Sequence, residues 1–255
     1  MSQHPILINR DHPQITILTL NRPEKRNALN LELLNELLKA LQETKLDKSR
    51  RVLILQGNGS IFCAGLDLSE AANLDHAENS AKLIAEILKT LCTLPLVTIA
   101  LVQGAAIAGG AGLMAACDFA VAADGTSLGF PETHRGLIAA LVMTLLRRQL
   151  RDRDVRELLF LGELIDAERA RAIGLINRGV PQQQLQECGL QIAEKVLKGA
   201  PEATIKTKLL LEEFQPTSFE EDLRKAILYH HAARHSEEAK EGIRAFLEHR
   251  EPRWI

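Results

Sequence analysis

Strand-like apolar runs alternate with helical segments through the first half of this chain, and this alternation limits the fold more than any other feature. The predicted strands are Ile15–Leu20, Val52–Gln56, Leu96–Val102 and Phe119–Ala122. Leucines at helical spacing predict an amphipathic helix from Leu31 to Leu41, with Asn30 as its N-cap, and a second helix is expected near Ala81–Leu91. Strands joined by helices are typical of βαβ units, so the chain is expected to be an α/β protein.

From Thr144 onward the chain is almost entirely helical in pattern, and its composition changes near Lys198. Four helices are predicted: Leu185–Leu197, Ala203–Glu213, Phe219–His231 and Glu237–His249. With 255 residues, the chain is long enough for one substantial core and a small appended unit. We therefore expect a core over residues 1–198 and a C-terminal helical region over 199–255.

Bulk properties exclude several classes of partner. Apolar residues make up 46% of the chain and the net charge is -2, so neither nucleic acid nor an anionic membrane is an expected partner. No apolar run approaches the roughly 18–20 residues of a membrane span, and the N-terminus does not have the order of a signal peptide. The four cysteines are scattered without a C-x-x-C pair, which favours buried free thiols in a reducing cytoplasm. A cytoplasmic protein is expected.

Two of the predicted strands run into turns of small residues. Leu96–Val102 leads into Gln103–Asp118, which is rich in glycine and alanine, and Val52–Gln56 leads toward Ala64 and Gly65. The first amides of a helix point outward toward negative charge, and two such turns could aim two backbone N–H groups at one carbonyl oxygen. Small residues at these places also suit tight helix packing, and the glycine-rich segment alone fits both interpretations.

The chain resembles the crotonase superfamily, also called the enoyl-CoA hydratase/isomerase family. The resemblance is carried, in order along nearly the whole chain, by Leu20–Leu29, Phe62–Asp67, Gly104–Asp118, Gly129–Glu132, Leu161–Ala170, Ala172–Asn177 and Gly242–Arg250. It implies a spiral of ββα units whose C-terminal helices are used for trimer packing. It also implies a homotrimer, or a hexamer built as a dimer of trimers.

The resemblance further implies an acyl-CoA thioester as substrate and no separate cofactor, since coenzyme A is part of the substrate. The thioester carbonyl would lie between the backbone amides of Ala64 and Gly109, and Glu132 would be the general acid/base. Residues expected to bind the CoA ester are Arg26, Ala28, Ala64, Gly65, Asp67, Leu68 and Gly110, with Phe246 and Arg250 from the C-terminal helix of a neighbouring subunit. The lysine that the family places after the aromatic residue is His249 here.

Position 112 departs from the hydratase pattern, because Gly112 stands where hydratases have a glutamate. A glycine cannot activate water, so hydration by two carboxylates lacks one of its groups. Double-bond isomerisation needs a single group that moves a proton, and the stretch Glu132–Ile138 is similar to that of the family's isomerases. His134 and Ile138 are further candidates for the pocket, and the apolar residues 138–142 predict an apolar acyl site.

Three other functions stay open on this scaffold. The same enolate site could serve a decarboxylase or a hydrolase, or the chain could be a non-catalytic CoA-binding protein. A metal site is not expected: His231 and His235 have metal-ligand spacing beside His230, but the sequence supplies no suitable third ligand.

Overall fold

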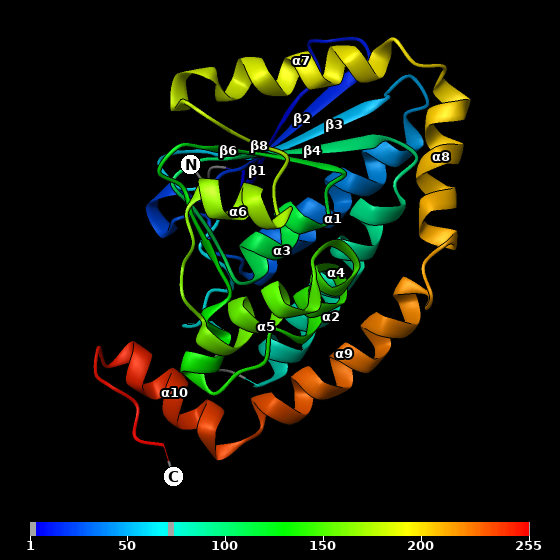
Figure 1. The fold of residues 1–255 in the computed structure, drawn as a ribbon. Helices are drawn as coiled ribbons and strands as arrows, with labels where there is room; N and C mark the ends of the chain where they lie inside the picture. The colour runs from blue at the N-terminus through cyan, green and yellow to red at the C-terminus, as the bar shows by residue number, and fades with distance from the viewer. Residues whose placement is uncertain (1–3, 71–73, 255) are drawn as a thin grey trace.

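The computed structural model describes residues 4–70 and 74–254 and shows a six-stranded sheet with helices on both faces (Figure 1). The strand order is β1-β2-β3-β4-β6-β8, and every neighbouring pair is parallel except β1 with β2. These strands are β1 (Ile6–Asn9), β2 (Ile15–Leu20), β3 (Val52–Gly57), β4 (Val97–Val102), β6 (Phe119–Ala123) and β8 (Arg178–Val180). The predicted α/β class and all four predicted strands are confirmed.

The central strands are apolar along their length because both faces of the sheet are covered. Side chains alternate along β3: Val52 and Ile54 belong to the core under α7 (Leu185–Leu197), whereas Leu53 and Leu55 belong to the larger core on the other face. Helix α7 approaches the sheet closely, since a Cβ on Gly189 would lie 2.7 Å from Leu101 Cδ2.

The opposite face of the sheet carries most of the helices before residue 180 (Figure 1). They are α1 (Leu31–Leu46), α2 (Leu74–Thr93), α3 (Gly109–Ala115), α4 (Ala140–Gln149), α5 (Asp152–Leu161) and α6 (Ala167–Ile173). The N-cap of α1 is confirmed, because Asn30 Oδ1 accepts a hydrogen bond of 3.0 Å from the amide of Leu33. Helix α2 is longer at both ends than the predicted Ala81–Leu91.

A second, two-stranded parallel sheet joins β5 (Ala105–Ile107) to β7 (Ser127–Gly129). The sequence pattern led from Val102 to the glycine-rich segment without a further strand; β5 intervenes, and helix α3 begins at Gly109. The described residues also include three short 3₁₀ helices: Pro23–Lys25, Pro131–Arg135 and Gln182–Gln184.

The last three helices descend past the edge of the sheet and continue along the side of the molecule opposite α7 (Figure 1). They are α8 (Pro201–Glu213), α9 (Phe219–Arg234) and α10 (Glu237–Leu247). Buried Lys208 on α8 donates to the carbonyls of Leu91 and Leu96 and pairs with Asp118 at 2.7 Å. The four predicted C-terminal helices are confirmed. A division at residue 198, falling between α7 and α8, and a role for these helices in a trimer stay predictions.

Within the described ranges, none of the helices combines the length and the apolar character that crossing a membrane requires. The four cysteines are free, and Cys63, Cys117 and Cys188 are buried, as the sequence predicted. Burial raises the pKa of the Cys63 thiol to about 12, so this thiol is held in its neutral form.

Candidate active site

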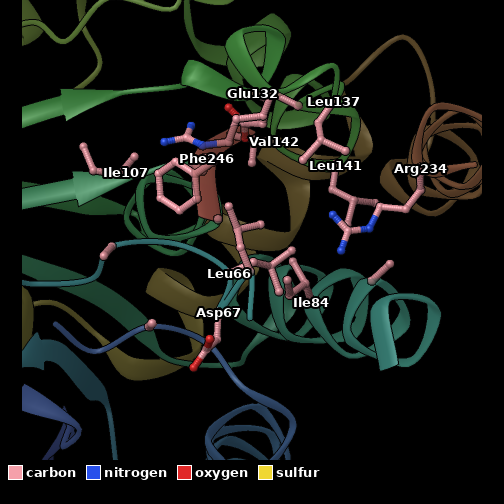
Figure 2. Close-up of a pocket in the computed structure, with 18 of the residues that line it drawn as sticks. Leu66, Asp67, Ile84, Ile107, Glu132, Leu137, Leu141, Val142, Arg234 and Phe246 are labelled. Carbon is pink, nitrogen blue, oxygen red and sulfur yellow. The ribbon is translucent and has the colours of Figure 1, made fainter. Parts of the chain in front are cut away.

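A cavity of about 330 Å³ opens between the turns that follow β3 and β5, the 3₁₀ segment Pro131–Arg135, and helices α4, α9 and α10. Figure 2 shows its apolar residues in two groups: Leu137, Leu141 and Val142 beside Glu132, and Leu66 and Ile84 nearer Asp67. Segments that are far apart in the sequence thus share one pocket. The apolar stretch 138–142 lines it, as predicted.

The two small-residue turns lie against each other beside this cavity. Cys63 and Ala106 form a parallel bridge, in which the Cys63 amide donates to Ala105 at 3.1 Å and the Ile107 amide donates to Cys63 at 3.0 Å. A Cβ on Gly65 would lie only 2.9 Å from the carbonyl oxygen of Ile107, and Gly65 has a φ of +87°. Only glycine suits this position, and the turns are held in register by backbone contacts.

Gly109 lines the cavity as the first residue of α3, where a backbone amide has no acceptor within its own helix. Ala108, just before it, has a φ of 51° and a ψ of -121°, a conformation that L residues rarely adopt. The Ala108 amide donates to Gly129 at 2.8 Å, which holds the strained turn in place. The geometry therefore presents the Gly109 amide at a fixed place beside the pocket.

The Ala64 amide also belongs to the cavity wall, but it already donates to the carbonyl of Arg26 at 3.0 Å. Arg26 and the adjacent Asn27 both have left-handed backbones, with φ of 54° and 52°. The Asn27 side chain fixes this loop, since its Nδ2 donates to the carbonyls of Asn58, Ile61 and Phe62. A ligand oxygen at Ala64 would have to share the N–H group with Arg26 or displace it.

Glu132 projects into the cavity from the first turn of the 3₁₀ segment that follows β7 (Figure 2). Its Oε2 is buried and has no hydrogen-bond partner among the described residues. Burial raises the pKa of Glu132 to about 7, although the backbone amide of Glu132 and the charge of Arg135 act in the opposite direction. A carboxyl group with a pKa near neutrality can both accept and return a proton.

Arg135 lies one turn after Glu132 and also lines the cavity. Its guanidinium stacks on the ring of Phe246 at 4.6 Å, and its Nη1 donates to the carbonyl of Pro131 at 3.1 Å. Helix α10 packs tightly here, because a Cβ on Gly242 would collide with the Arg135 backbone. Phe246 thus lines the cavity of its own chain. Its expected contact with the CoA ester of a neighbouring subunit stays a prediction.

Gly112 lies on α3, is buried, and is not part of the cavity lining. A Cβ at this position would lie 2.9 Å from Val142 Cγ2. Val142 itself lines the cavity, so its side chain occupies the space into which a residue at 112 would project. Position 112 therefore supplies no carboxylate, and a side chain there would crowd Val142.

Six of the nine residues expected to bind the CoA ester line the cavity: Arg26, Ala28, Ala64, Asp67, Leu68 and Phe246. The carboxylate of Asp67 pairs with Arg22 at 3.4 Å and accepts a hydrogen bond from Ser69 at 2.6 Å. Asp67 therefore helps to fix the loop after the first turn.

Other predicted site residues lie elsewhere. Gly65 and Gly110 support the turns from behind, and a Cβ on Gly110 would meet the carbonyl of Cys63 at 2.5 Å. The exposed His134 packs against Gly162 outside the cavity. Arg250 pairs with Glu241 and Glu248 at 2.7 and 2.6 Å, so its charge is engaged away from the pocket.

Two basic residues of α9 line the cavity, and sequence reasoning placed neither of them there. Arg234 is only 4% exposed, and Figure 2 shows its guanidinium turned toward the pocket beyond Leu141 and Ile84. His230 lies one turn earlier on the same helix face. The histidine cluster was considered only as a metal site. Across residues 4–70 and 74–254, no three His, Cys, Asp or Glu side chains are grouped to hold a metal ion.

Comparison with known proteins agrees with this geometry. The pattern of the family described as "Enoyl-CoA hydratase/isomerase" matches residues 10–255. A putative enoyl-CoA hydratase of Thermus thermophilus is 36% identical over 253 residues, covering 97% of this chain and 100% of the relative. An enoyl-CoA isomerase/hydratase of Mycosarcoma maydis is 32% identical over 247 residues, covering 92% and 90%. The crystal structure of a putative enoyl-CoA hydratase from Mycobacterium avium paratuberculosis superposes with a TM-score of 0.89 at 32% identity, covering 98% and 99%.

Proposed function

Because this chain belongs to the enoyl-CoA hydratase/isomerase family, we propose that it converts a 3-enoyl-CoA into a 2-enoyl-CoA through an enolate, with Glu132 as the single acid/base. The family identifies the chain as an enzyme that acts on acyl-CoA thioesters. The choice of isomerisation within the family is the further step, and it depends on the site.

One observation carries this proposal: the site has the buried carboxyl group of Glu132, and Val142 fills the space beside Gly112. Glu132 has its pKa raised to about 7 by burial, which suits a group that must take a proton and give it back near neutral pH. Val142 occupies the space that a carboxylate at position 112 would need. Hydration needs a second group to activate water, whereas isomerisation does not.

The proposed reaction begins with the substrate thioester carbonyl beside the Gly109 amide. Glu132 removes a proton from the carbon next to the carbonyl, and the electron pair of the C–H bond moves toward the carbonyl oxygen. The Gly109 and Ala64 amides stabilise the resulting negative charge, a contribution worth about 3 kcal/mol of barrier per donor in comparable sites. The Ala64 N–H would share its hydrogen between this oxygen and Arg26.

The second half of the reaction returns the same proton at the far end of the conjugated system. The enolate electrons shift back through the adjacent double bond, and the terminal carbon of that bond takes the proton from Glu132. The double bond is then conjugated with the thioester, and the carboxylate is ready for another cycle. Apolar walls from Leu66, Leu137 and Leu141 keep water away from the reacting carbons.

The test is the conversion of 3-hexenoyl-CoA by the wild-type protein and by Glu132→Gln. Glutamine keeps the shape but cannot transfer the proton, so the rate is expected to fall by about 1,000-fold while binding of hexanoyl-CoA is retained. Turnover that survives the substitution would remove Glu132 from the proposal. Absence of turnover with CoA-ester binding intact would favour a non-catalytic CoA-binding protein.

A decarboxylase or hydrolase on the same scaffold is tested with the same protein. A decarboxylase would release carbon dioxide from a malonyl-type CoA ester, and a hydrolase would release free CoA from a thioester such as 3-hexenoyl-CoA. Neither would move the double bond.

A further inference from the structure

The acyl pocket of this protein is apolar along its walls but ends at a buried cation. Leu66, Ile84 and Leu141 form the wall, and Arg234 lies beyond them with 4% of its surface exposed (Figure 2). Asp67, which marks the expected CoA side, lies at a different end of the pocket from Arg234 (Figure 2). An acyl chain entering from the CoA side and passing Glu132 would therefore approach Arg234 with its far end.

A guanidinium is an unusual group for the end of a pocket that receives a plain hydrocarbon chain. Its charge is costly to bury, and burial accordingly lowers the pKa of Arg234. A terminal methyl group cannot accept a hydrogen bond from this cation. A carboxylate can, and the planar fork of five N–H donors can bind it at two points while keeping an existing contact to the protein.

His230 extends the polar end of the pocket. It lies four residues before Arg234 on α9 and also lines the cavity. Its Nε2 is buried without a hydrogen-bond partner among the described residues, while the ring is held by a hydrogen bond with the backbone of Ile138. Burial lowers the pKa of His230 to about 4, so the ring is neutral in the empty pocket and its Nε2 can only accept a hydrogen bond. A carboxylate bound beside it would favour the protonated ring, whose Nε2 can donate.

We propose that Arg234 makes the far end of the acyl pocket a receptor for a carboxylate, so that the preferred substrates are CoA thioesters of dicarboxylic acids. This inference rests on the proposed function for the identity of the chain that fills the pocket. It adds the chemical class of that chain: an apolar middle section with a negative charge at the end remote from CoA. Arg234 then acts as a specificity-determining residue and takes no part in proton transfer.

The test compares the binding of saturated CoA esters, which cannot isomerise. Isothermal titration would measure Kd for hexanoyl-CoA against adipoyl-CoA and for octanoyl-CoA against suberoyl-CoA, so that each pair differs only in the terminal group. We expect the acid-terminated ester to bind at least about 30-fold more tightly at one of these lengths. Methyl-terminated esters that bind as tightly as their acidic partners at both lengths would overturn the inference.

Two substitutions on α9 sharpen this comparison. Arg234→Met removes the charge but keeps a long side chain, and should reduce the preference to less than about threefold. Arg224→Met is the matched control, because Arg224 is exposed on the same helix, and it should leave the preference unchanged. A preference that persists in Arg234→Met would overturn the inference. If that variant does not fold, Arg234→Lys keeps the charge without the two-point geometry. A preference for the acid-terminated ester equal to that of the wild type would then contradict two-point binding by the guanidinium.

The binding measurements also separate this inference from the proposed reaction. A preference for adipoyl-CoA without isomerisation of 3-enoyl esters would support the carboxylate receptor and contradict the proposed reaction. Isomerisation of 3-hexenoyl-CoA with equal binding of both ester types would support the reaction and contradict the receptor.

Discussion

Val142 Cγ2 lies 2.9 Å from the place where a Cβ on Gly112 would be. The two residues come from neighbouring helices, α3 and α4, and between them they decide whether a second carboxylate can enter the site. The absence of a glutamate at position 112 and the branched side chain opposite it are two parts of one arrangement. The proposed one-base reaction rests on this contact together with Glu132.

The first prediction concerns the restoration of a second carboxylate. Gly112→Glu alone should destabilise the fold by about 1–3 kcal/mol because it overfills the space beside Val142. Gly112→Glu combined with Val142→Ala removes the crowding methyl groups, and should raise hydration of crotonyl-CoA at least about tenfold over the wild type. Urea unfolding and the loss of the conjugated thioester absorbance measure the two effects.

Val142→Ala by itself is the control for this pair, and it should not gain hydration. If Gly112→Glu alone were as stable as the wild type, the helix contact could not be the reason why position 112 is small.

The second prediction is the pH dependence of catalysis. As a base, Glu132 must be ionised in the free enzyme, so kcat/KM for 3-hexenoyl-CoA should rise with pH and level off above about 7. Arg135 lowers the pKa of Glu132 by its charge, and Arg135→Met should therefore move the rise to higher pH. A flat profile, or a shift to lower pH in the variant, would contradict the role given to this pair.

The third prediction concerns stability. The pKa of Glu132 is about 7 in the folded protein against an ordinary 4.5, so the folded state binds the proton more tightly than the unfolded state. The stability contributed by the protonated carboxyl is fully present below about pH 4.5 and is lost as the pH rises to about 7. At pH 8.5 the buried carboxylate costs up to about 3 kcal/mol.

Glu132→Gln removes this dependence and should be more stable than the wild type at pH 8.5 but not at pH 4.5. Urea unfolding at both pH values measures the difference. An equal difference at both would mean that the substitution acts through packing and that the carboxyl group is not desolvated.

Much of the fold could be predicted because long apolar runs and regular leucine spacing report on burial directly. The strands β2, β3, β4 and β6 and helix α1 with its cap at Asn30 belong to this class. The three-residue strand β5 could not be predicted, since it is too short to show a period and is fixed by backbone bonds to the Cys63 turn.

Site residues that stand in the ordered set of motifs could be predicted from the sequence. Those brought to the cavity only by tertiary packing could not. Ala64, Gly109 and Glu132 stand in such motifs and all line one cavity. Arg234 stands in none: a basic residue on an amphipathic helix is usually solvated, and only the packing of α9 against the core turns it inward. The strained φ of Ala108 was equally hidden, because alanine ordinarily avoids that conformation.

The central claim is that this site has one proton-transferring group and therefore favours isomerisation over hydration. The most direct measurement is the ratio of kcat/KM for 3-hexenoyl-CoA isomerisation to kcat/KM for 2-hexenoyl-CoA hydration, with the same enzyme at pH 8. Since a positioned acid or base contributes about 100-fold or more, the ratio is predicted to exceed about 100. A ratio near or below one, with ready formation of the 3-hydroxy product, would contradict the claim and show that water is activated without a carboxylate at position 112.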